Sequence, residues 1–257
     1  MQDVILARLR KLEYEQGVQV LYACESGSRA WGFASPDSDY DVRFVYARPV
    51  EQYLRLALPR DVIEVPMEGE LDISGWDLFK ACRLLRRSNP PLLEWLGSPI
   101  VYLEQGPLAQ TLRDQANRHA SRRSCCEHYL HSARSNWHRY GLDADRATRK
   151  KLLYVLRPVV AVRWMLEQES LPPTPFPRAL AAVAIPSAIR EAIDALLAAK
   201  RVSRESATGP ADPLLLRYVE QTLEELGPLV AKLEPCAFPA DKLDQLLRAI
   251  LLKEAAL

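Results

Sequence analysis

Apolar residues recur every three or four positions between residues 3 and 16, and Gly17 stands where a C-terminal cap belongs. This spacing predicts a helix over 3–16. The next segment, 18–24, is rich in β-forming side chains and runs up to the Gly27-Ser28 pair. We therefore expect a strand that ends in a turn at this pair.

The following residues favour short elements separated by turns. Ser35-Pro36-Asp37-Ser38 is a strong turn signal. Around it, the pattern predicts a short helical turn at 29–33, strands at 39–46, 61–65 and 70–74, and a helix at about 76–87. A few strands mixed with helices in about 100 residues indicate a small α+β domain with a mixed sheet.

From residue 105 the periodicity becomes helical and gives no convincing alternating pattern. We read 89–91 and 98–99 as connections and expect helices at about 107–140, 145–169, 187–201, 213–226 and 239–254. Proline-bearing stretches such as 171–175 separate them. The sequence thus predicts two domains, a mixed-sheet domain over 1–105 and an all-helical domain over 106–257.

Composition places the chain among ordinary globular proteins, with 48% hydrophobic and 26% charged residues in 257. The five cysteines are odd in number and form no CxxC pair, so we expect a reducing compartment rather than disulfides. No basic segment precedes an apolar one at the N-terminus, and no apolar run reaches the length of a membrane span. We therefore expect a cytoplasmic protein without a membrane partner.

Charge is unevenly distributed, although the net charge is only +1. Residues 113–163 hold twelve Lys or Arg against four Asp or Glu. Such an excess could attract a polyanion such as RNA, or the triphosphate of a nucleotide. It could equally be a solvated face.

Three aspartates are the strongest chemical signal. Asp39 and Asp41 would project from the same side of the strand 39–46, because side chains alternate along a strand. Asp72 could join them from a neighbouring strand. Converging carboxylates repel one another unless a cation lies between them, and hard oxygen ligands suit Mg²⁺ bridged to phosphates, with Mn²⁺ as the alternative ion.

A phosphate-binding turn is predicted just upstream. Gly27 and Ser28 lie at a strand-to-helix turn, where glycine lets a phosphate approach the backbone and the serine hydroxyl adds a donor. Arg29 could reach the triphosphate or be solvated. Arg43 would share the face of Asp39 and Asp41, and could bind phosphate or neutralise a carboxylate.

A second set of candidates lies in the helical half. Lys151, Tyr154 and Arg157 recur at helical spacing and fall near one face of a helix. Their side chains suit contact with a nucleotide. The alternative is a face that pairs with the acidic domain.

Together these residues resemble a known family. Gly27-Ser28, Asp39-Tyr40-Asp41 and Asp72 are similar to the GS…DxD…D motif of the DNA polymerase β-like nucleotidyltransferase superfamily. The longer runs 25–43, 71–77, 88–99 and 151–158 resemble the predicted bacterial nucleotidyltransferases called RNA-ligase-associated polymerases. The resemblance covers residues 15–170 and, more loosely, the C-terminal third.

This resemblance implies a Mg²⁺-dependent nucleotidyltransferase that binds an NTP, ATP included, in the setting of RNA repair. It would transfer a nucleoside monophosphate to a hydroxyl of RNA, a protein or a small molecule and release pyrophosphate. Asp72 would help to activate that hydroxyl, and the helical domain would close over the nucleotide. The rival hypothesis is a catalytically weak binding protein of the same fold, either a toxin-neutralising partner or a nucleotide sensor.

Overall fold

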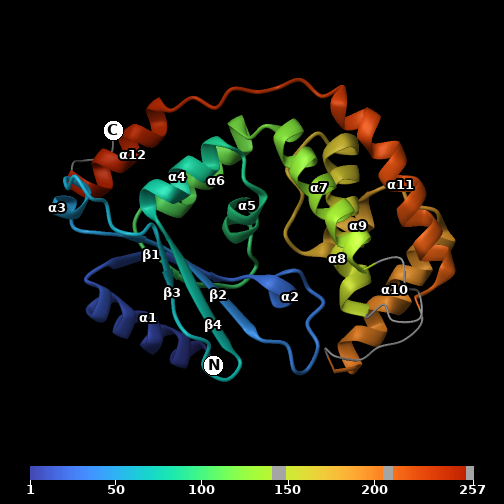
Figure 1. The fold of residues 1–257 in the computed structure, drawn as a ribbon, viewed down its shortest axis with the longest axis horizontal. Coiled ribbons are helices and arrows are strands. Elements are labelled where there is room, and N and C mark those ends of the chain that lie inside the picture. The colour runs from blue at the N-terminus through green and yellow to red at the C-terminus, as the bar shows by residue number, and fades with distance from the viewer. Residues whose placement is uncertain (141–148, 205–210, 253–257) are drawn as a thin grey trace. The chain divides into compact units, whose positions relative to one another are not determined.

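The computed structural model describes residues 1–140, 149–204 and 211–252 (Figure 1). Its contacts group the chain into two compact units. The sheet unit comprises Met1–Gly27, Asp39–Ala120 and Ala237–Leu257, and the helical unit comprises Ser28–Ser38 and Ser121–Cys236. The predicted domain boundary at 105/106 stays a prediction. The contacts change from the sheet unit to the helical unit at 120/121. They also assign 28–38 to the helical unit and 237–257 to the sheet unit, although the residues that flank each segment in the sequence belong to the other unit.

A five-stranded mixed sheet forms the centre of the sheet unit. Its strands are β1 (Gln19–Glu25), β2 (Tyr40–Ala47), β3 (Val62–Glu64), β4 (Leu71–Asp77) and β5 (Val101–Glu104), in the order β3-β4-β2-β1-β5. β2 and β4 run parallel, whereas the other three neighbouring pairs are antiparallel. The predicted α+β class with a mixed sheet is therefore confirmed.

Helices cover both faces of this sheet. They are α1 (Gln2–Gln16), α3 (Val50–Tyr53), α4 (Leu78–Arg86), α5 (Pro90–Leu96), α6 (Leu108–His119) and α12 (Asp241–Leu252). Within the sheet unit, α1 lies on one side of the sheet and α4 to α6 lie on the other (Figure 1). A further short helix, α2 (Gly27–Ala30), has its first residue in the sheet unit and its other residues in the helical unit.

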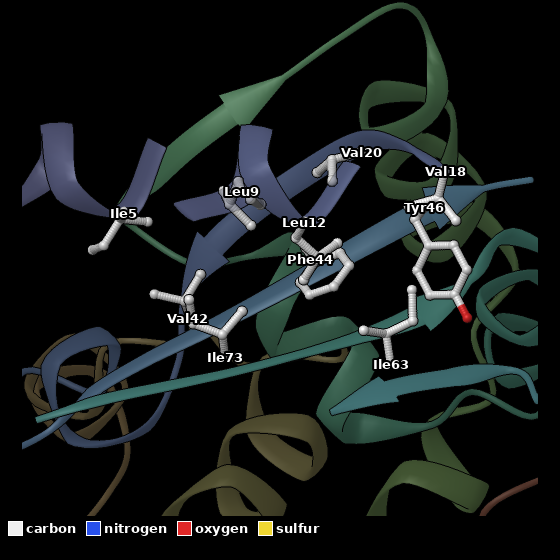
Figure 2. Close-up of a cluster of buried hydrophobic side chains, with 11 residues drawn as sticks. Ile5, Leu9, Leu12, Val18, Val20, Val42, Phe44, Tyr46, Ile63 and Ile73 are labelled. Carbon is white, nitrogen blue, oxygen red and sulfur yellow. The ribbon is translucent and has the colours of Figure 1, made fainter. Parts of the chain in front are cut away.

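The main core of the sheet unit lies between α1 and the sheet (Figure 2). Ile5, Leu9 and Leu12 form the buried stripe of α1, as their spacing predicts. Gly17 ends the helix in the left-handed conformation, with φ 59°, and its N–H donates to Glu13 O. Each large apolar side chain buried here contributes about 1.5–3 kcal/mol to folding. The helix and its cap are confirmed.

This core also determines which way β2 faces. Val42, Phe44 and Tyr46 are fully buried in the cluster that includes the α1 stripe. Because side chains alternate along a strand, Asp41 and Arg43 project from the opposite face of the sheet. The polar candidates of β2 therefore lie away from the α1 core.

Helices build the other unit in its described residues. They are α7 (Arg122–Tyr140), α8 (Arg149–Glu167), α9 (Phe176–Ala182), α10 (Ser187–Val202) and α11 (Pro213–Ala231). The predicted helices at 187–201 and 213–226 are confirmed, although the second extends further. No helix of the described residues is long and apolar enough to cross a membrane.

Several predicted boundaries were wrong for local reasons. The single helix predicted at 107–140 is two helices, because Ala120 is extended and the Ser121 hydroxyl accepts the N–H of Ser124 as an N-cap. The stretch 89–91 is a helix start rather than a connection, since Asn89 caps α5 and proline is tolerated in its first turn. Residues 145–148 and 253–254 lie outside the described residues.

Three further elements were not predicted: the short helix α3, the helix α9 and the strand β5. The helix α9 begins directly after the proline-bearing stretch 171–175 that we had read as a separator, again with proline in its first turn. The edge strand β5 has only four residues, which is too short for alternation to show. It pairs with β1, so long-range pairing and not local pattern defines it.

Candidate active site

Two predicted metal ligands lie side by side on parallel strands. Asp41 of β2 is the register partner of Asp72 of β4. The Arg43 guanidinium bridges them: Nη2 donates to Asp41 Oδ1 at 3.0 Å and to Asp72 Oδ2 at 2.7 Å. Its Nη1 also donates to Asp72 O at 3.2 Å. Arg43 could bind phosphate or neutralise a carboxylate, and in this structure it contacts the two carboxylates.

Gly27 packs directly against the Asp41 carboxylate. Its φ is +58°, and a Cβ added there would lie 2.0 Å from Asp41 Oδ2. The Ser26 N–H donates to Asp41 O at 2.8 Å, which joins the chain before Gly27 to the beginning of β2. Glycine is thus required here both for backbone conformation and for close approach.

Glu25 contributes a contact that sequence reasoning missed. Its side chain is fully buried at the end of β1. Its Oε1 accepts the N–H of Asp41 at 2.7 Å, and its Oε2 accepts the hydroxyl of Tyr102. Glu25 therefore fixes the backbone of Asp41. A charged residue two positions before Gly27 was the available signal, but the partner of Glu25 is distant in sequence.

The segment 94–99, which carried part of the family resemblance, supports the same strand end. Ser98 Oγ donates to Glu25 O at 2.6 Å, and Tyr22 OH donates to Trp95 O at 2.6 Å. Trp95 also stacks on Trp76 of β4, with ring centroids 3.8 Å apart. These contacts give the resemblance in this segment a structural reason.

Asp39 precedes β2, which begins at Tyr40, and its side chain is partly buried. No group of three or more His, Cys, Asp or Glu side chains among the described residues is arranged to hold a metal ion. Asp41 and Asp72 are the two predicted ligands that the structure places next to each other. The ligand role of Asp39 stays a prediction.

Ser28 and Arg29, the next candidates along the chain, are described within the helical unit. Ser28 is buried, and its carbonyl oxygen accepts the N–H of Phe33 at 3.0 Å. Arg29 Nη2 donates to Ser38 O at 2.6 Å. Arg29 is therefore not a merely solvated side chain. Both phosphate-binding roles stay predictions.

Tyr154 and Arg157 gather around Trp31 in the helical unit. The Arg157 guanidinium lies over the Trp31 ring, 4.0 Å from its centroid, and Tyr154 meets the same ring edge-on at 5.7 Å. Such cation–π stacking contributes about 0.5–2 kcal/mol. Lys151 is partly buried on the same helix. The structure thus brings two of the three predicted nucleotide contacts together around an aromatic ring.

Many arginines of the basic region 113–163 are engaged within their own units. These contacts join Arg113 to Glu104, Arg122 to Met165 O, Arg123 to Glu127, Arg134 to Leu223 O and Arg163 to Glu225. Internal pairing explains part of the excess charge, because Arg113 and Arg163 pair with Glu104 and Glu225, two acids outside the counted segment. RNA binding by this region stays a prediction.

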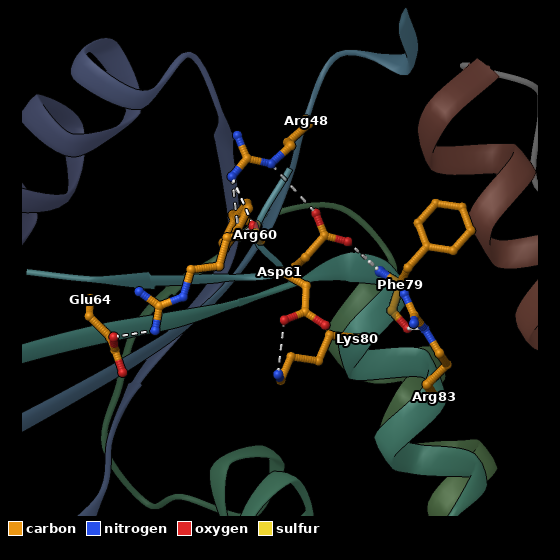
Figure 3. A network of polar contacts seen from close by, with 9 residues as sticks. Arg48, Arg60, Asp61, Glu64, Phe79, Lys80 and Arg83 are labelled. Atoms are coloured by element: carbon orange, nitrogen blue, oxygen red, sulfur yellow. Dashed lines mark hydrogen bonds and ion pairs between the residues drawn. The ribbon is translucent and has the colours of Figure 1, made fainter. Parts of the chain in front are cut away.

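A small pocket lies at the other end of β4, near the network of polar contacts drawn in Figure 3. It holds about 90 Å³ and is lined by Tyr53, Leu58, Pro59, Asp61, Asp77, Phe79 and Arg83. Asp77 accepts the Tyr53 hydroxyl at 2.9 Å and the Phe79 N–H at 2.8 Å, and burial raises its pKa above the ordinary value. Asp61 is paired with Lys80 at 3.0 Å. These acids are satisfied internally, which indicates a structural role.

A family model and a sequence relative agree with the motif. The model of the family described as "RNA repair pathway DNA polymerase beta family" (RlaP) matches residues 1–249. The uncharacterized protein YcgL of Bacillus subtilis (strain 168) is 39% identical over 226 residues, which span 88% of this chain and 86% of that protein. A crystal structure of a nucleotidyltransferase-like protein from Exiguobacterium sibiricum 255-15 has a TM-score of 0.32 at 13% identity, covering 96% of this chain and 79% of that one. By the extent of the family match and the identity to YcgL, this chain belongs to the RNA repair pathway DNA polymerase beta family.

Proposed function

We propose that the chain is a nucleotidyltransferase that transfers a nucleoside monophosphate from an NTP to a hydroxyl acceptor and releases pyrophosphate. The observation that carries this proposal is the pairing of Asp41 with Asp72 on adjacent parallel strands, beside Gly27. Family membership supports the same reaction class. RNA is the acceptor we favour within it, because the family description names RNA repair.

The donor chemistry at this pair fits a magnesium ion. Both side chains offer carboxylate oxygens, and the Asp41 and Asp72 side chains retain 28% and 40% of their exposure. Mg²⁺ is commonly held by one or two carboxylates together with substrate phosphates and water, so two protein ligands suffice. Mn²⁺ prefers the same oxygen ligands.

Arg43 acts as the cation at this pair in the present geometry. Its guanidinium contacts one oxygen of each carboxylate, and this is the position that a divalent ion coordinated by both would compete for. A metal ion that bound these same two oxygens would require Arg43 to release at least one carboxylate. The released guanidinium is then available to bind a phosphate oxygen.

Bound Mg²⁺ would supply charge neutralisation for the triphosphate and for the departing pyrophosphate. The protein residues would do the rest. Asp41 would hold the ion to which the triphosphate binds, and the backbone at Gly27 would leave room for the triphosphate. Asp72 would accept the proton of the acceptor hydroxyl, either directly or through water. Glu25 would keep Asp41 in place through its backbone N–H.

The test has a binding arm and a transfer arm. Free Mn²⁺ measured by electron paramagnetic resonance, with and without ATP, reports the metal site directly. Incubation with each labelled NTP, Mg²⁺ and cellular RNA or protein reports transfer. We expect Asp41→Asn to abolish both Mn²⁺ binding and transfer, and Asp72→Asn to impair transfer more than nucleotide binding.

The matched control is Asp3→Asn, which removes an exposed carboxylate on α1. It should leave Mn²⁺ binding and transfer unchanged. If Asp41→Asn retains near-normal transfer, the assignment of the site is wrong. If Asp72→Asn weakens nucleotide binding more than transfer, its assigned role is wrong.

One observation supports the alternative of a catalytically weak binding protein. The repulsion between Asp41 and Asp72 is offset by Arg43, so the fold tolerates both carboxylates without a metal ion. The same two arms separate the functions. Nucleotide binding without transfer to any acceptor would favour a nucleotide sensor or a toxin-neutralising partner.

A further inference from the structure

A lysine is buried in the apolar stripe of α10. Ile189, Ile193, Leu197 and Lys200 are the buried residues of this helix, and Lys200 is only 2% exposed. Their spacing of three and four places the lysine where the stripe would continue with another apolar side chain. Removing an ammonium group from water is costly, so its retention requires compensating contacts.

The Lys200 ammonium reaches a turn far away in the sequence. Its Nζ donates to Ser35 Oγ at 3.2 Å. Ser35 Oγ and Ser38 Oγ are 2.9 Å apart, and Ser38 Oγ also accepts the N–H of Ser35. An ammonium can only donate, so Ser35 Oγ accepts from Lys200, and either hydroxyl can donate in the contact between Ser35 and Ser38. Both serines are buried.

Backbone contacts close the same turn. Ser38 N–H donates to Ser35 O at 3.1 Å, which makes 35–38 a β-turn with Pro36 in its second position. The Arg29 guanidinium donates to Ser38 O at 2.6 Å. Two cations, Lys200 and Arg29, thus bind the turn from different elements of the helical unit. Asp39 is the next residue of the chain after this turn.

We infer that Lys200 is a positioning residue for the acidic motif, because it fixes the turn that leads into Asp39 and Asp41. The inference rests on the proposed function for its consequence at the metal site. The role given to Lys200 is to restrict the backbone of Ser38 through Ser35, so that Asp39 is presented in one conformation. A charged donor is needed because hydrogen bonds from ionised groups are stronger than those from neutral ones.

The test compares three variants of the full chain. Lys200→Met keeps the length and apolar stem but removes the donor, and Lys200→Arg keeps a donor. Arg201→Met is the control, because Arg201 is the neighbouring cation of α10 and is exposed. Amide hydrogen exchange is measured over 35–41 and over α11, and Mn²⁺–ATP affinity is measured by calorimetry.

We expect Lys200→Met to accelerate exchange in 35–41 by about ten-fold and to weaken Mn²⁺–ATP binding by about ten-fold, with α11 unchanged. Lys200→Arg should recover part of both effects, and Arg201→Met should change neither. Unchanged exchange and affinity in Lys200→Met would overturn the inference. So would a loss of protection that is as large in α11 as in 35–41.

The inference can still be tested if Lys200→Met does not fold or if the wild-type chain binds no Mn²⁺–ATP. If Lys200→Met does not fold, Ser35→Ala replaces it, because it removes the acceptor hydroxyl and leaves the lysine; the same local acceleration is expected, and its absence overturns the inference. If the wild-type chain binds no Mn²⁺–ATP, the proposed function fails. Exchange over 35–41 then still decides whether Lys200 fixes the turn.

Discussion

Asp41 lies directly opposite Asp72 in the parallel pairing of β2 and β4. Two carboxylates in this relationship repel each other, and the fold offsets the repulsion with Arg43, which contacts both. Arg43 neutralises only one of the two negative charges, so the cluster stays net negative and can still attract a cation. The affinity of this acidic pair for divalent cations depends on how readily Arg43 releases the carboxylates.

Arg43→Met should make the fold dependent on divalent cations. Without Mg²⁺ we expect a loss of about 1–2 kcal/mol in the free energy of unfolding, since both carboxylates lose their partner. Adding Mg²⁺ should recover more stability in the variant than in the wild type, because no guanidinium competes. Urea denaturation with and without Mg²⁺ measures both. Arg60→Met, which breaks an exposed pair with Glu64, is the control and should show neither effect.

Gly27→Ala and Gly17→Ala form a matched pair. Both glycines have φ near +58°, but a Cβ at Gly17 meets nothing within 4 Å, whereas at Gly27 it would meet Asp41 Oδ2 at 2.0 Å. We expect Gly17→Ala to cost about 1 kcal/mol from backbone strain alone. Gly27→Ala should cost more and should also weaken Mn²⁺ binding. Equal losses, with metal binding intact, would contradict the close packing of Gly27 on Asp41.

Asp77 should give stability a pH dependence that Asp77→Asn removes. Burial is the largest cause that raises the pKa of Asp77 above its ordinary value of 3.8, while Asp61 also raises it and Arg48 lowers it. A folded-state pKa above the unfolded value means that this contribution to stability is present at low pH and is lost as pH rises through the folded pKa. Asparagine caps helices as well as aspartate does.

Denaturation of wild type and Asp77→Asn between pH 7 and about 4 measures this difference. The wild type should gain relative to the variant as pH falls. Asp241→Asn, at an exposed position on α12, is the control. A relative gain with rising pH would contradict the assignment.

RNA binding by the basic region can be tested at Arg122 and Arg123. If several residues of 113–163 contact phosphates, RNA affinity should fall steeply with salt, and the double change Arg122→Glu with Arg123→Glu should lower it about ten-fold while ATP affinity is kept. Filter binding across a salt series, with calorimetry for ATP, measures both.

The control for this experiment is Arg217→Glu, an exposed arginine of α11 outside the basic region. Circular dichroism is needed beside it, because Arg123 also contacts Glu127 and Leu233 O within the helical unit. A flat salt response with no effect of the reversal would assign these arginines to internal pairing and favour a protein or small-molecule acceptor.

Local patterns were sufficient for the parts of the fold that local physics determines. The stripe of α1, its Gly17 cap and the strand β2 follow from spacing and backbone conformation, so the sequence predicted them nearly to the residue. Asp41 and Asp72 were identified as partners from motif and resemblance. The short elements β5 and α9 were not predicted, because long-range pairing defines β5 and α9 begins with proline in its first turn.

Only the tertiary structure decided what surrounds these aspartates. The parallel register sets Asp41 against Asp72, and this places the two carboxylates close enough for one guanidinium of Arg43 to bind both. The role of Glu25 follows from its contact with Asp41, 16 residues away in the sequence. The role of Lys200 follows from its contact with Ser35, 165 residues away. Periodicity reports burial along one element, whereas these roles arise from charged groups that meet across elements, where desolvation forces each to find a partner.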